Sequence, residues 1–245
     1  MNLAIITPTH KSLISTEEHK RLTISLQTNF SFPHFFVIPD SLDTRNISMS
    51  FPNSKFEKFN DTFFSSIYNF NYLMLDPSFY ERFIEFDYVL ICQFDAFLVK
   101  SIEPILKNNF TYLGPSWNPS IYVTKFRSKL YFNRIRFSSP ISYKLQSGTG
   151  GLSLRKTRKL YELLTTVKKS SFYNSVIGNN RNANEDILIT YILKKFGYPI
   201  VSKEIADTFF IESTPRNQYN INNIFGFHRL SRYDPVLERS LLDNF

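Results

Sequence analysis

Apolar residues recur along the chain in short continuous runs, and these runs alternate with stretches of helical spacing. Residues 3–7, 34–38 and 88–92 are mostly apolar, which predicts strands buried on both faces of a parallel sheet. Between the first two runs, Ser15-Thr16-Glu17-Glu18 fits a capping box and predicts a helix that extends to about Asn29. Strand, helix and strand at this spacing predict a βαβ unit, and therefore an α/β fold.

Helical spacing and loop composition predict the rest of the chain. Helices are expected over 62–75, 77–86, 102–107, 155–168 and 185–196, and a short strand over 110–113. Polar or aperiodic stretches predict loops over 41–54, 115–147 and 170–183, and an irregular segment over 198–245 with one β-like run at 208–211. Because no internal repeat or linker interrupts the chain, we expect residues 1–245 to form a single domain.

The composition is that of a globular protein. Of the 245 residues, 42% are hydrophobic and 20% are charged, which excludes a disordered chain. The single cysteine, Cys92, lies within an apolar run, which favours a small buried residue in a reducing compartment. Residues 1–8 contain no basic segment, and no apolar run approaches ~18 residues. We therefore expect neither a signal peptide nor a transmembrane helix, and a cytoplasmic location.

The net charge of +8 favours anionic partners. A nucleotide diphosphate, an acidic glycan, an anionic membrane and a nucleic acid would all fit that charge. Residues 125–137 interleave cations with aromatic rings, which suits nucleic acid or peripheral contact with the inner face of a membrane, but an ordinary solvated basic face of a helix or hairpin is the favoured interpretation. We expect no nucleic-acid partner, because the sequence contains no recognised nucleic-acid-binding module.

The most informative carboxylate is Asp95, in the segment Gln93-Phe94-Asp95-Ala96. It follows directly after the apolar run that ends at Cys92, so it should lie at the carboxyl edge of the sheet, where open α/β sheets bind ligands. A charge is costly to bury there unless a metal, a cation or hydrogen bonds compensate it. Two interpretations follow from the residues alone: a metal ligand, or an aspartate that caps a turn.

Three later segments are candidates for the same site. Gly148-Thr149-Gly150-Gly151 clusters glycines that permit close approach of a ligand, or simply a turn before a strand, and it fits neither a dinucleotide fingerprint nor a Walker A loop. Asn184-Glu185-Asp186 predicts a helix start whose carboxylates interact favourably with the helix dipole, or provide a general base. Gly226-Phe227-His228 places a histidine where it could bind a metal or pack in the core.

The order of these motifs resembles a bacterial family of glycosyltransferase-like proteins that is catalogued as a domain of unknown function. The resemblance spans about residues 1–230 and is carried by five short motifs: Q-x-D-A at 93–96, G-x-x-W at 114–117, G-x-G-G-x-S-L-R at 148–155, N-E-D at 184–186 and G-F-H at 226–228. A more distant similarity is to the β-1,4-galactosyltransferases. This similarity implies a GT-A-like fold, a single α/β domain around a twisted, mostly parallel sheet flanked by helices.

The similarity to galactosyltransferases also implies a role for each matched position. Asp95 matches the metal-binding second Asp of a D-x-D motif whose first position is Gln93 here, and His228 matches a C-terminal metal ligand. Asp186 and Glu185 match the acceptor-binding and catalytic-base carboxylates. The other expected contacts are with the donor (Thr7, Thr9 and Gln93) and with the acceptor (Trp117, Gly150, Gly151 and Asn184).

The implied activity is transfer of a sugar from a nucleotide-diphosphate donor to a glycan or lipid-linked acceptor, in the synthesis of bacterial surface polysaccharide. The similarity implies a cation, Mn²⁺ or Mg²⁺, on Asp95 and His228, and such mixed ligands favour Mn²⁺. Asp186 or Glu185 would deprotonate the acceptor for in-line attack, which predicts inversion. Arg155 is expected to hold an anionic group or to face solvent.

A second hypothesis belongs to a different class of protein. The chain could be a non-catalytic module that binds a glycan or a membrane on a degenerate transferase fold. The glutamine at the first position of the D-x-D motif, Gln93, favours this alternative. Hydrolysis of a nucleotide sugar in the presence of Mn²⁺ would distinguish the two.

Overall fold

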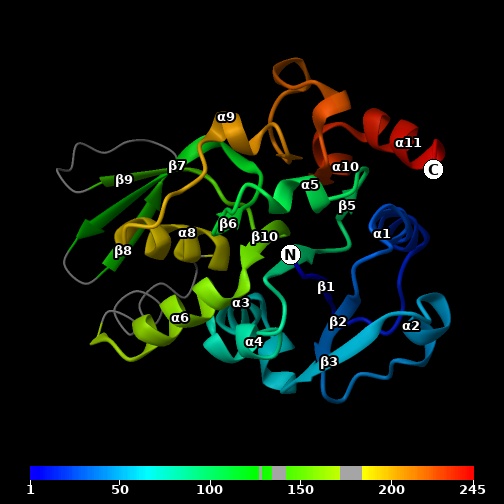
Figure 1. Ribbon diagram of the computed structural model, residues 1–245, viewed down its shortest axis with the longest axis horizontal. Coiled ribbons are helices and arrows are strands. Elements are labelled where there is room, and N and C mark those ends of the chain that lie inside the picture. The colour runs from blue at the N-terminus through cyan, green and yellow to red at the C-terminus, as the bar shows by residue number, and fades with distance from the viewer. Residues whose placement is uncertain (127–128, 134–141, 172–183) are drawn as a thin grey trace.

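The computed structural model describes residues 1–126, 129–133, 142–171 and 184–245, in which helices pack around a central sheet (Figure 1). Almost all of the loop predicted over 170–183 lies outside the described residues, as does part of the basic stretch 125–137. Among the described residues, no helix combines the length and the apolar character needed to cross a bilayer.

The central sheet has six strands in the order β3-β2-β1-β4-β10-β6. The first four run parallel, whereas β10 is antiparallel to β4 on one side and to β6 on the other. The sheet is therefore mixed, and the expectation of a mostly parallel sheet holds only for its first four strands. The six strands of this sheet are β1 (Leu3–Pro8), β2 (His34–Pro39), β3 (Lys55–Phe59), β4 (Tyr88–Cys92), β6 (Tyr112–Leu113) and β10 (Leu152–Lys156).

The predicted βαβ unit is confirmed. Strands β1 and β2 are parallel, with Ile5 opposite His34, and α1 (Thr16–Thr28) connects them. The capping box forms at the predicted residues: Ser15 Oγ accepts a hydrogen bond from Glu18 N at 3.3 Å, and the Glu18 carboxylate accepts one from Ser15 N at 2.9 Å. Both residues thus satisfy backbone N–H groups that the helix itself leaves unpaired.

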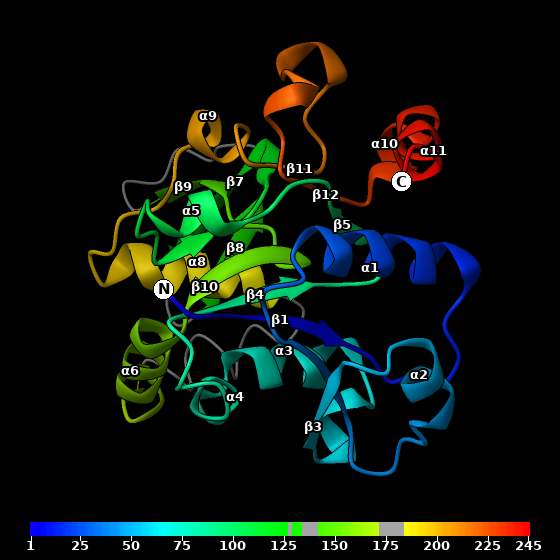
Figure 2. The ribbon, with the colours of Figure 1, turned by 45° about the vertical axis from the view of Figure 1, so that its right-hand side comes forward.

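Alternate residues of the central strands enter different cores on the two faces of the sheet. Figure 2 shows α1 and α5 (Glu103–Leu106) on one side of the sheet, and α3 (Ile67–Leu75), α4 (Pro77–Glu81) and α6 (Thr157–Lys168) on the other. Ile5 and Leu90 belong to the first core, and Ile6 and Ile91 belong to the second. Burial on both faces explains why these strands are continuous apolar runs in the sequence.

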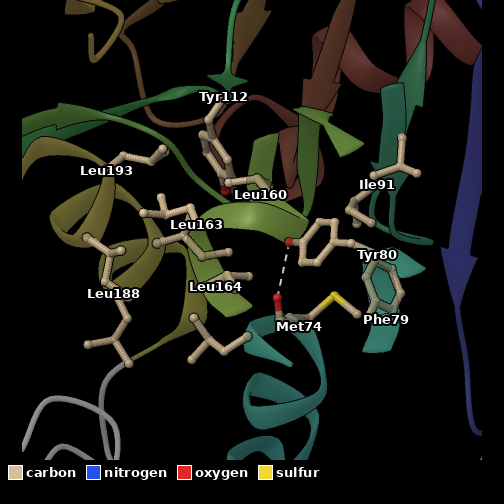
Figure 3. Close-up of a cluster of buried hydrophobic side chains, with 14 of the residues drawn as sticks. Met74, Phe79, Tyr80, Ile91, Tyr112, Leu160, Leu163, Leu164, Leu188 and Leu193 are labelled. Carbon is tan, nitrogen blue, oxygen red and sulfur yellow. Dashed lines mark hydrogen bonds between the residues drawn. The ribbon is translucent and has the colours of Figure 1, made fainter. Parts of the chain in front are cut away.

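The larger core lies between the sheet, α3, α4, α6 and α8 (Glu185–Lys195) (Figure 3). Leu160 and Leu164 of α6 and Leu188 of α8 point into it. Tyr80 also lies in this core, and its hydroxyl donates a hydrogen bond to the carbonyl oxygen of Met74 at 3.1 Å. The α8 helix ends before Gly197, whose φ of 78° is the left-handed conformation that a C-terminal glycine supplies, as the sequence predicted.

The prediction of loops over 115–147 is wrong. A second, antiparallel sheet of order β8-β7-β9 occupies this region, formed by β7 (Ser116–Phe126), β8 (Lys129–Asn133) and β9 (Ser142–Ser147). Its apolar residues alternate with polar ones, as Ile121 and Val123 do, and the register shifts between Ser116 and Ile121. Because a proline and this irregularity interrupt the alternation, no regular period is visible in the sequence.

Several other segments also differ from the sequence-based prediction. The loop predicted over 41–54 contains a helix, and the strands over 55–59 and 96–98 were not predicted. Within 198–245, Phe210–Ile211 is a strand inside the predicted β-like run, but the other short regular elements were not predicted. The corresponding bounds are α2 (Arg45–Ser50), β5 (Ala96–Leu98), α9 (Lys203–Ala206), β11 (Phe210–Ile211), β12 (Gly226–His228), α10 (Leu230–Tyr233) and α11 (Pro235–Asp243), with 3₁₀ turns at Asp61–Phe64, Arg216–Gln218 and Ile221–Asn223. Most of these elements are too short to show a period.

A buried histidine connects the first strands of the sheet. His34 Nε2 lies 3.0 Å from Thr7 Oγ1, and His34 Nδ1 lies 2.6 Å from Ser54 Oγ. The Thr7 hydroxyl donates to the carbonyl oxygen of Cys92 at 2.9 Å, so Thr7 must accept its bond from His34 Nε2–H. Burial lowers the pKa of His34 from 6.5 to about 3. The imidazole is therefore neutral in the folded protein at neutral pH.

We expect the free energy of unfolding to fall as the pH drops from 7 to 5, because the unfolded chain then binds a proton at His34 that the native protein does not bind. A pKa of 6.5 in the unfolded chain against about 3 in the fold makes this loss about 2 kcal/mol at pH 5. His34→Gln should remove it, as measured by urea unfolding of both proteins at the two pH values. An equal pH dependence in both proteins would contradict a neutral buried His34.

Candidate active site

Asp95 lies where the sequence placed it, in a tight turn directly after β4. The turn closes through a hydrogen bond from Ala96 N to the Gln93 carbonyl oxygen at 2.9 Å. The chain then continues as β5, which pairs antiparallel with β12 so that Ala96 lies opposite His228. This pairing brings the C-terminal histidine to the aspartate, as the resemblance implied.

Asp95, His228 and two further residues form a charged cluster. Asp95 Oδ1 lies 3.3 Å from His228 Nε2, and Asp95 Oδ2 lies 3.2 Å from Arg229 Nε. On the far side of the imidazole, His228 Nδ1 lies 3.5 Å from Glu212 Oε2. Glu212 was not among the predicted residues, although it directly follows the β-like run noted at 208–211 and is mostly buried.

The charges of this cluster shift one another's pKa. Burial alone would lower the pKa of His228, but Asp95 and Glu212 outweigh it and raise that pKa to about 9. Burial likewise acts to raise the pKa of Asp95, but His228 and Arg229 outweigh it and lower that pKa to about 2. At neutral pH the cluster thus holds an imidazolium between two carboxylates, and a cation bound at His228 Nε2 would have to displace its proton.

The Gly150-Gly151 pair lies between this cluster and the helix that carries the acidic residues. A Cβ atom on Gly151 would be 2.2 Å from His228 Nε2 and 2.8 Å from Gln93 Oε1, and one on Gly150 would be 2.3 Å from Glu185 Oε1. No side chain fits at either position. The two glycines therefore let α8, β12 and the end of β4 approach one another, which is a structural reason for the motif noted in the sequence.

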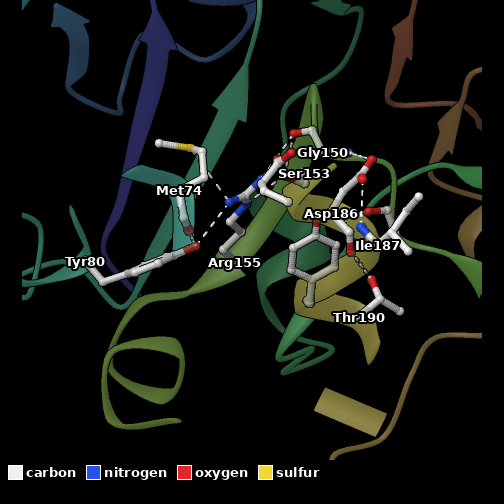
Figure 4. Close-up of polar contacts among 11 residues, drawn as sticks. Met74, Tyr80, Gly150, Ser153, Arg155, Asp186, Ile187 and Thr190 are labelled. Atoms are coloured by element: carbon white, nitrogen blue, oxygen red, sulfur yellow. Dashed lines mark hydrogen bonds and ion pairs between the residues drawn. The ribbon is translucent and has the colours of Figure 1, made fainter. Parts of the chain in front are cut away.

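Glu185 and Asp186 begin α8, and both are mostly buried. The Asp186 carboxylate accepts hydrogen bonds from Gly150 N at 3.1 Å and from Ile187 N at 2.7 Å (Figure 4). Burial, and then the charge of Glu185, raise the pKa of Asp186 to about 7 in spite of these bonds. Near neutral pH this carboxyl can therefore accept or release a proton, as a general acid or base must.

The expectation that Arg155 holds a ligand anion or faces solvent is wrong. Arg155 is fully buried, and its Nη2 pairs with Glu185 Oε1 at 3.0 Å. Figure 4 shows the guanidinium among the groups that satisfy it: Ser153 Oγ at 2.9 Å from Nε and the Tyr80 hydroxyl at 3.1 Å from Nη1. Arg155 lies on β10, whereas the sequence pattern predicts that it begins a helix. Its charge stabilises Glu185 within the protein.

A cavity of about 400 Å³ opens at the carboxyl edge of β1 and β4. Thr9 and Gln93 line it from the strand ends, and Phe64, Ile67 and Phe70 line it from the other side. Two of the expected donor-binding residues therefore share one cavity, which is large enough for a small ligand.

The remaining predicted residues are placed differently. Thr7 is fully buried and its hydroxyl is occupied by Cys92 and His34, so it is turned away from this cavity. Trp117 is mostly buried within the larger core and offers no open ring face. Asn184 is exposed at the N-cap of α8, but its side chain makes no capping hydrogen bond. Its predicted contact with the acceptor is compatible with this exposure.

Asp95 and His228 are the two residues that could bind a divalent cation at this site. Asp95 Oδ1 and His228 Nε2 are buried and have no hydrogen-bond partner of good geometry among the described residues. Their separation of 3.3 Å is close to the ~3 Å expected between neighbouring ligands of one Mn²⁺ or Mg²⁺ ion. No set of three or more metal-binding side chains occurs within the described ranges. The pair thus fits as a partial ligand set of the kind that phosphate oxygens and water complete.

The fold and this cluster define an α/β protein with a site of several carboxylates and one histidine at the carboxyl edge of its sheet. Residues 53–228 match the DUF5672 family, described as a protein of unknown function, and the chain belongs to this family. The matched region contains Asp95, Glu212 and His228 of the cluster, ends one residue before Arg229, and begins after β1 and β2. None of the curated proteins matches the chain.

We expect Arg155→Met to lower the free energy of unfolding by about 3–5 kcal/mol, because it leaves the Glu185 carboxylate buried without its partner. Adding Glu185→Gln should recover a large part of this loss, since the unpaired charge is then removed. Urea unfolding at pH 7 measures both effects. Arg45→Met, which breaks an exposed ion pair with Asp43, is the matched control and should change little. A double variant no more stable than Arg155→Met would contradict this electrostatic explanation.

Proposed function

We propose that this protein is a glycosyltransferase of GT-A-like fold that moves a sugar from a nucleotide-diphosphate donor to a glycan or lipid-linked acceptor. The observation that supports this most strongly is the juxtaposition of two groups across Gly150-Gly151. On one side is Asp186, a carboxyl with a pKa of about 7, and on the other is the Asp95–His228 pair. Transfer from such a donor needs both an acceptor base and a site that stabilises the leaving diphosphate.

The cavity beside Asp95 supports the donor part of the proposal. Phe64, Ile67 and Phe70 provide an apolar wall for a nucleoside, and Thr9 and Gln93 provide polar groups at the ends of β1 and β4. Gln93 lines this cavity and also lies close to Gly151, so it connects the cavity with the charged cluster. A donor would then lie with its nucleoside in the cavity and its diphosphate toward Asp95.

Asp95 and His228 are the residues that would hold a divalent cation, Mn²⁺ or Mg²⁺. When bound, such an ion supplies positive charge to the diphosphate as it leaves. Arg229 already contacts Asp95 Oδ2 at 3.2 Å and is half-exposed, so it can contribute a second positive charge at the same place. Glu212 orients the imidazole from its other nitrogen, a role that carboxylates commonly play behind metal-binding histidines.

Asp186 is the better candidate for the general base. Glu185 is committed to the buried Arg155, which stabilises its charged form and blocks one of its oxygens. Asp186 forms no ion pair with a cationic side chain in the described part of the chain, and its pKa of about 7 suits proton acceptance at neutral pH. In-line attack by an acceptor deprotonated in this way gives inversion at the anomeric carbon. Asn184, exposed at the start of α8, would contact that acceptor.

A second candidate function is a non-catalytic glycan- or membrane-binding module on the same fold. Two observations favour it: Arg229 occupies Asp95 Oδ2, and Gln93 stands in place of a further carboxylate ligand. A protein of this kind would bind a glycan or membrane without hydrolysing a nucleotide sugar. Incubation with a panel of nucleotide sugars and Mn²⁺, with detection of released nucleotide diphosphate, separates the two functions.

Mn²⁺ should raise the affinity for a nucleotide diphosphate at least tenfold, and Asp95→Ala should abolish that gain, because the variant lacks one of the two ion ligands. A thermal-shift screen of nucleotide diphosphates with and without Mn²⁺ identifies the ligand, and calorimetry measures its affinity. Asp43→Ala removes an exposed aspartate and should leave binding unchanged. Identical Mn²⁺ dependence in Asp95→Ala and the unmodified protein would refute the role of Asp95.

Replacing Asp186 with Asn should leave the affinity for donor intact while the transfer or hydrolysis rate falls about 10²–10⁴-fold, because the variant has no base for the acceptor. In the unmodified protein the rate should rise with pH through an apparent pKa near 7, the deprotonation of Asp186. Rates measured from pH 5 to 9 test both points. Activity that survives in Asp186→Asn but is lost in Glu185→Gln would show that Glu185, and not Asp186, is the general base.

A further inference from the structure

A second cavity, of about 660 Å³, lies between α1, the turn before β2 and the segment that leads from α2 into β3. Pro33 and His34, at the amino end of β2, form part of its wall. The candidate active site lies beyond the carboxyl ends of the same parallel strands. Because a strand of six residues is about 20 Å long, this cavity is separate from the donor site.

Aromatic and apolar side chains form most of the wall of this cavity. Phe30 stands at the rim with 87% of its surface exposed, and Phe51 lies below with its ring 4.8 Å from the ring of His19. The other apolar members are Leu26, Phe32, Pro33 and Pro52. An exposed phenylalanine beside further aromatic rings is a surface on which a flat apolar ligand can stack.

The lining of the cavity disfavours ionic ligands. None of its lining residues is Lys, Arg, Asp or Glu, although these make up 20% of the chain and the net charge is +8. Helix α1 ends here with no basic residue in its last turn, so its carbonyl end carries a partial negative charge that disfavours an anion. A phosphate-bearing ligand, such as the proposed donor, therefore finds no Lys or Arg in the lining to pair with. A cation likewise finds no carboxylate.

Uncharged hydrogen-bonding groups are available at the mouth of the cavity. The side chains of Gln27, Ser31, Ser50 and Asn53 line it and make no hydrogen bond within the described part of the chain. Two amides and two hydroxyls can thus donate to or accept from a neutral polar substituent. At the base, His34 and Ser54 bond to each other and are not available.

We propose that this cavity is a binding site for an uncharged, ring-bearing apolar small molecule that carries one or two hydrogen-bonding substituents. The ring stacks on the exposed Phe30, with the mostly buried Phe51 forming part of the wall, and the amides of Gln27 and Asn53 bind the substituent. Cavities of this size and composition suit such ligands. The inference does not depend on the transferase activity, because it rests on a different part of the sheet.

Two dyes that share one skeleton test the proposal with the full chain. The neutral dye is 1-anilinonaphthalene, and its anionic counterpart is 8-anilino-1-naphthalenesulfonate, which differs by one sulfonate. We expect saturable 1:1 fluorescence enhancement with the neutral dye, and at least tenfold weaker binding of the sulfonate. Non-specific attraction to a chain of net charge +8 would give the opposite order. Equal or tighter binding of the sulfonate would overturn the proposal.

Variants then locate the bound dye. Thr23→Trp, on the inner side of α1, should fill the cavity and weaken binding of the neutral dye at least tenfold, and Gln27→Trp at the mouth is a second, more exposed filling variant. Ser240→Trp places the same indole in a separate groove on α11 and should have no effect. Circular dichroism and urea unfolding confirm that each variant folds. Unchanged dye affinity in a folded Thr23→Trp or Gln27→Trp protein would refute the site.

Discussion

The buried charge of Arg155 is the interaction on which the candidate site depends. Its guanidinium lies in the centre of the protein, on β10, and has no access to water. A charge in such a place must be paired, and Glu185 at the start of α8 is the partner. The pairing therefore fixes the N-terminus of α8 against the sheet, and with it the neighbouring carboxyl of Asp186. A single buried ion pair thus joins the stability of the fold to the geometry of the site.

The Gly150-Gly151 pair imposes the second constraint, which is steric. Because neither position has room for a Cβ atom, the acidic start of α8 and the histidine of β12 can approach the same turn from two sides. Burial, and then the charge of Glu185, raise the pKa of Asp186, while His228 and Arg229 keep Asp95 ionised. Asp186 and Asp95, two carboxyl groups at the same edge of the central sheet, thus have different pKa values because their surroundings differ. Neighbouring acids acquire different chemical roles in this way.

Sequence patterns predicted the parts of the fold that local chemistry and burial on two faces determine. The runs that became β1, β2 and β4 were correctly placed because they are buried on both faces, and α1 because its capping box is a local signal. The antiparallel sheet around β7 was missed because its alternation is interrupted at Pro119 and its partners are set by tertiary contacts. The short strands β5 and β12 are stabilised by each other, across some 130 residues of chain, so neither has a local signal.

The same division holds for the site. The sequence by itself determined that Asp95 lies at the edge of the sheet and that Glu185 and Asp186 begin a helix, because strand ends and helix starts are visible in the local sequence. It did not show that 150–151 need to be glycine, because the atoms that a Cβ would meet there belong to His228 and Glu185. Only the tertiary structure decided that Arg155 is buried and pairs with Glu185, that Thr7 and Trp117 belong to the interior, and that Glu212 stands behind His228. Those facts depend on which distant strands pair, and a long-range pairing is a property of the whole packed chain rather than of any one segment.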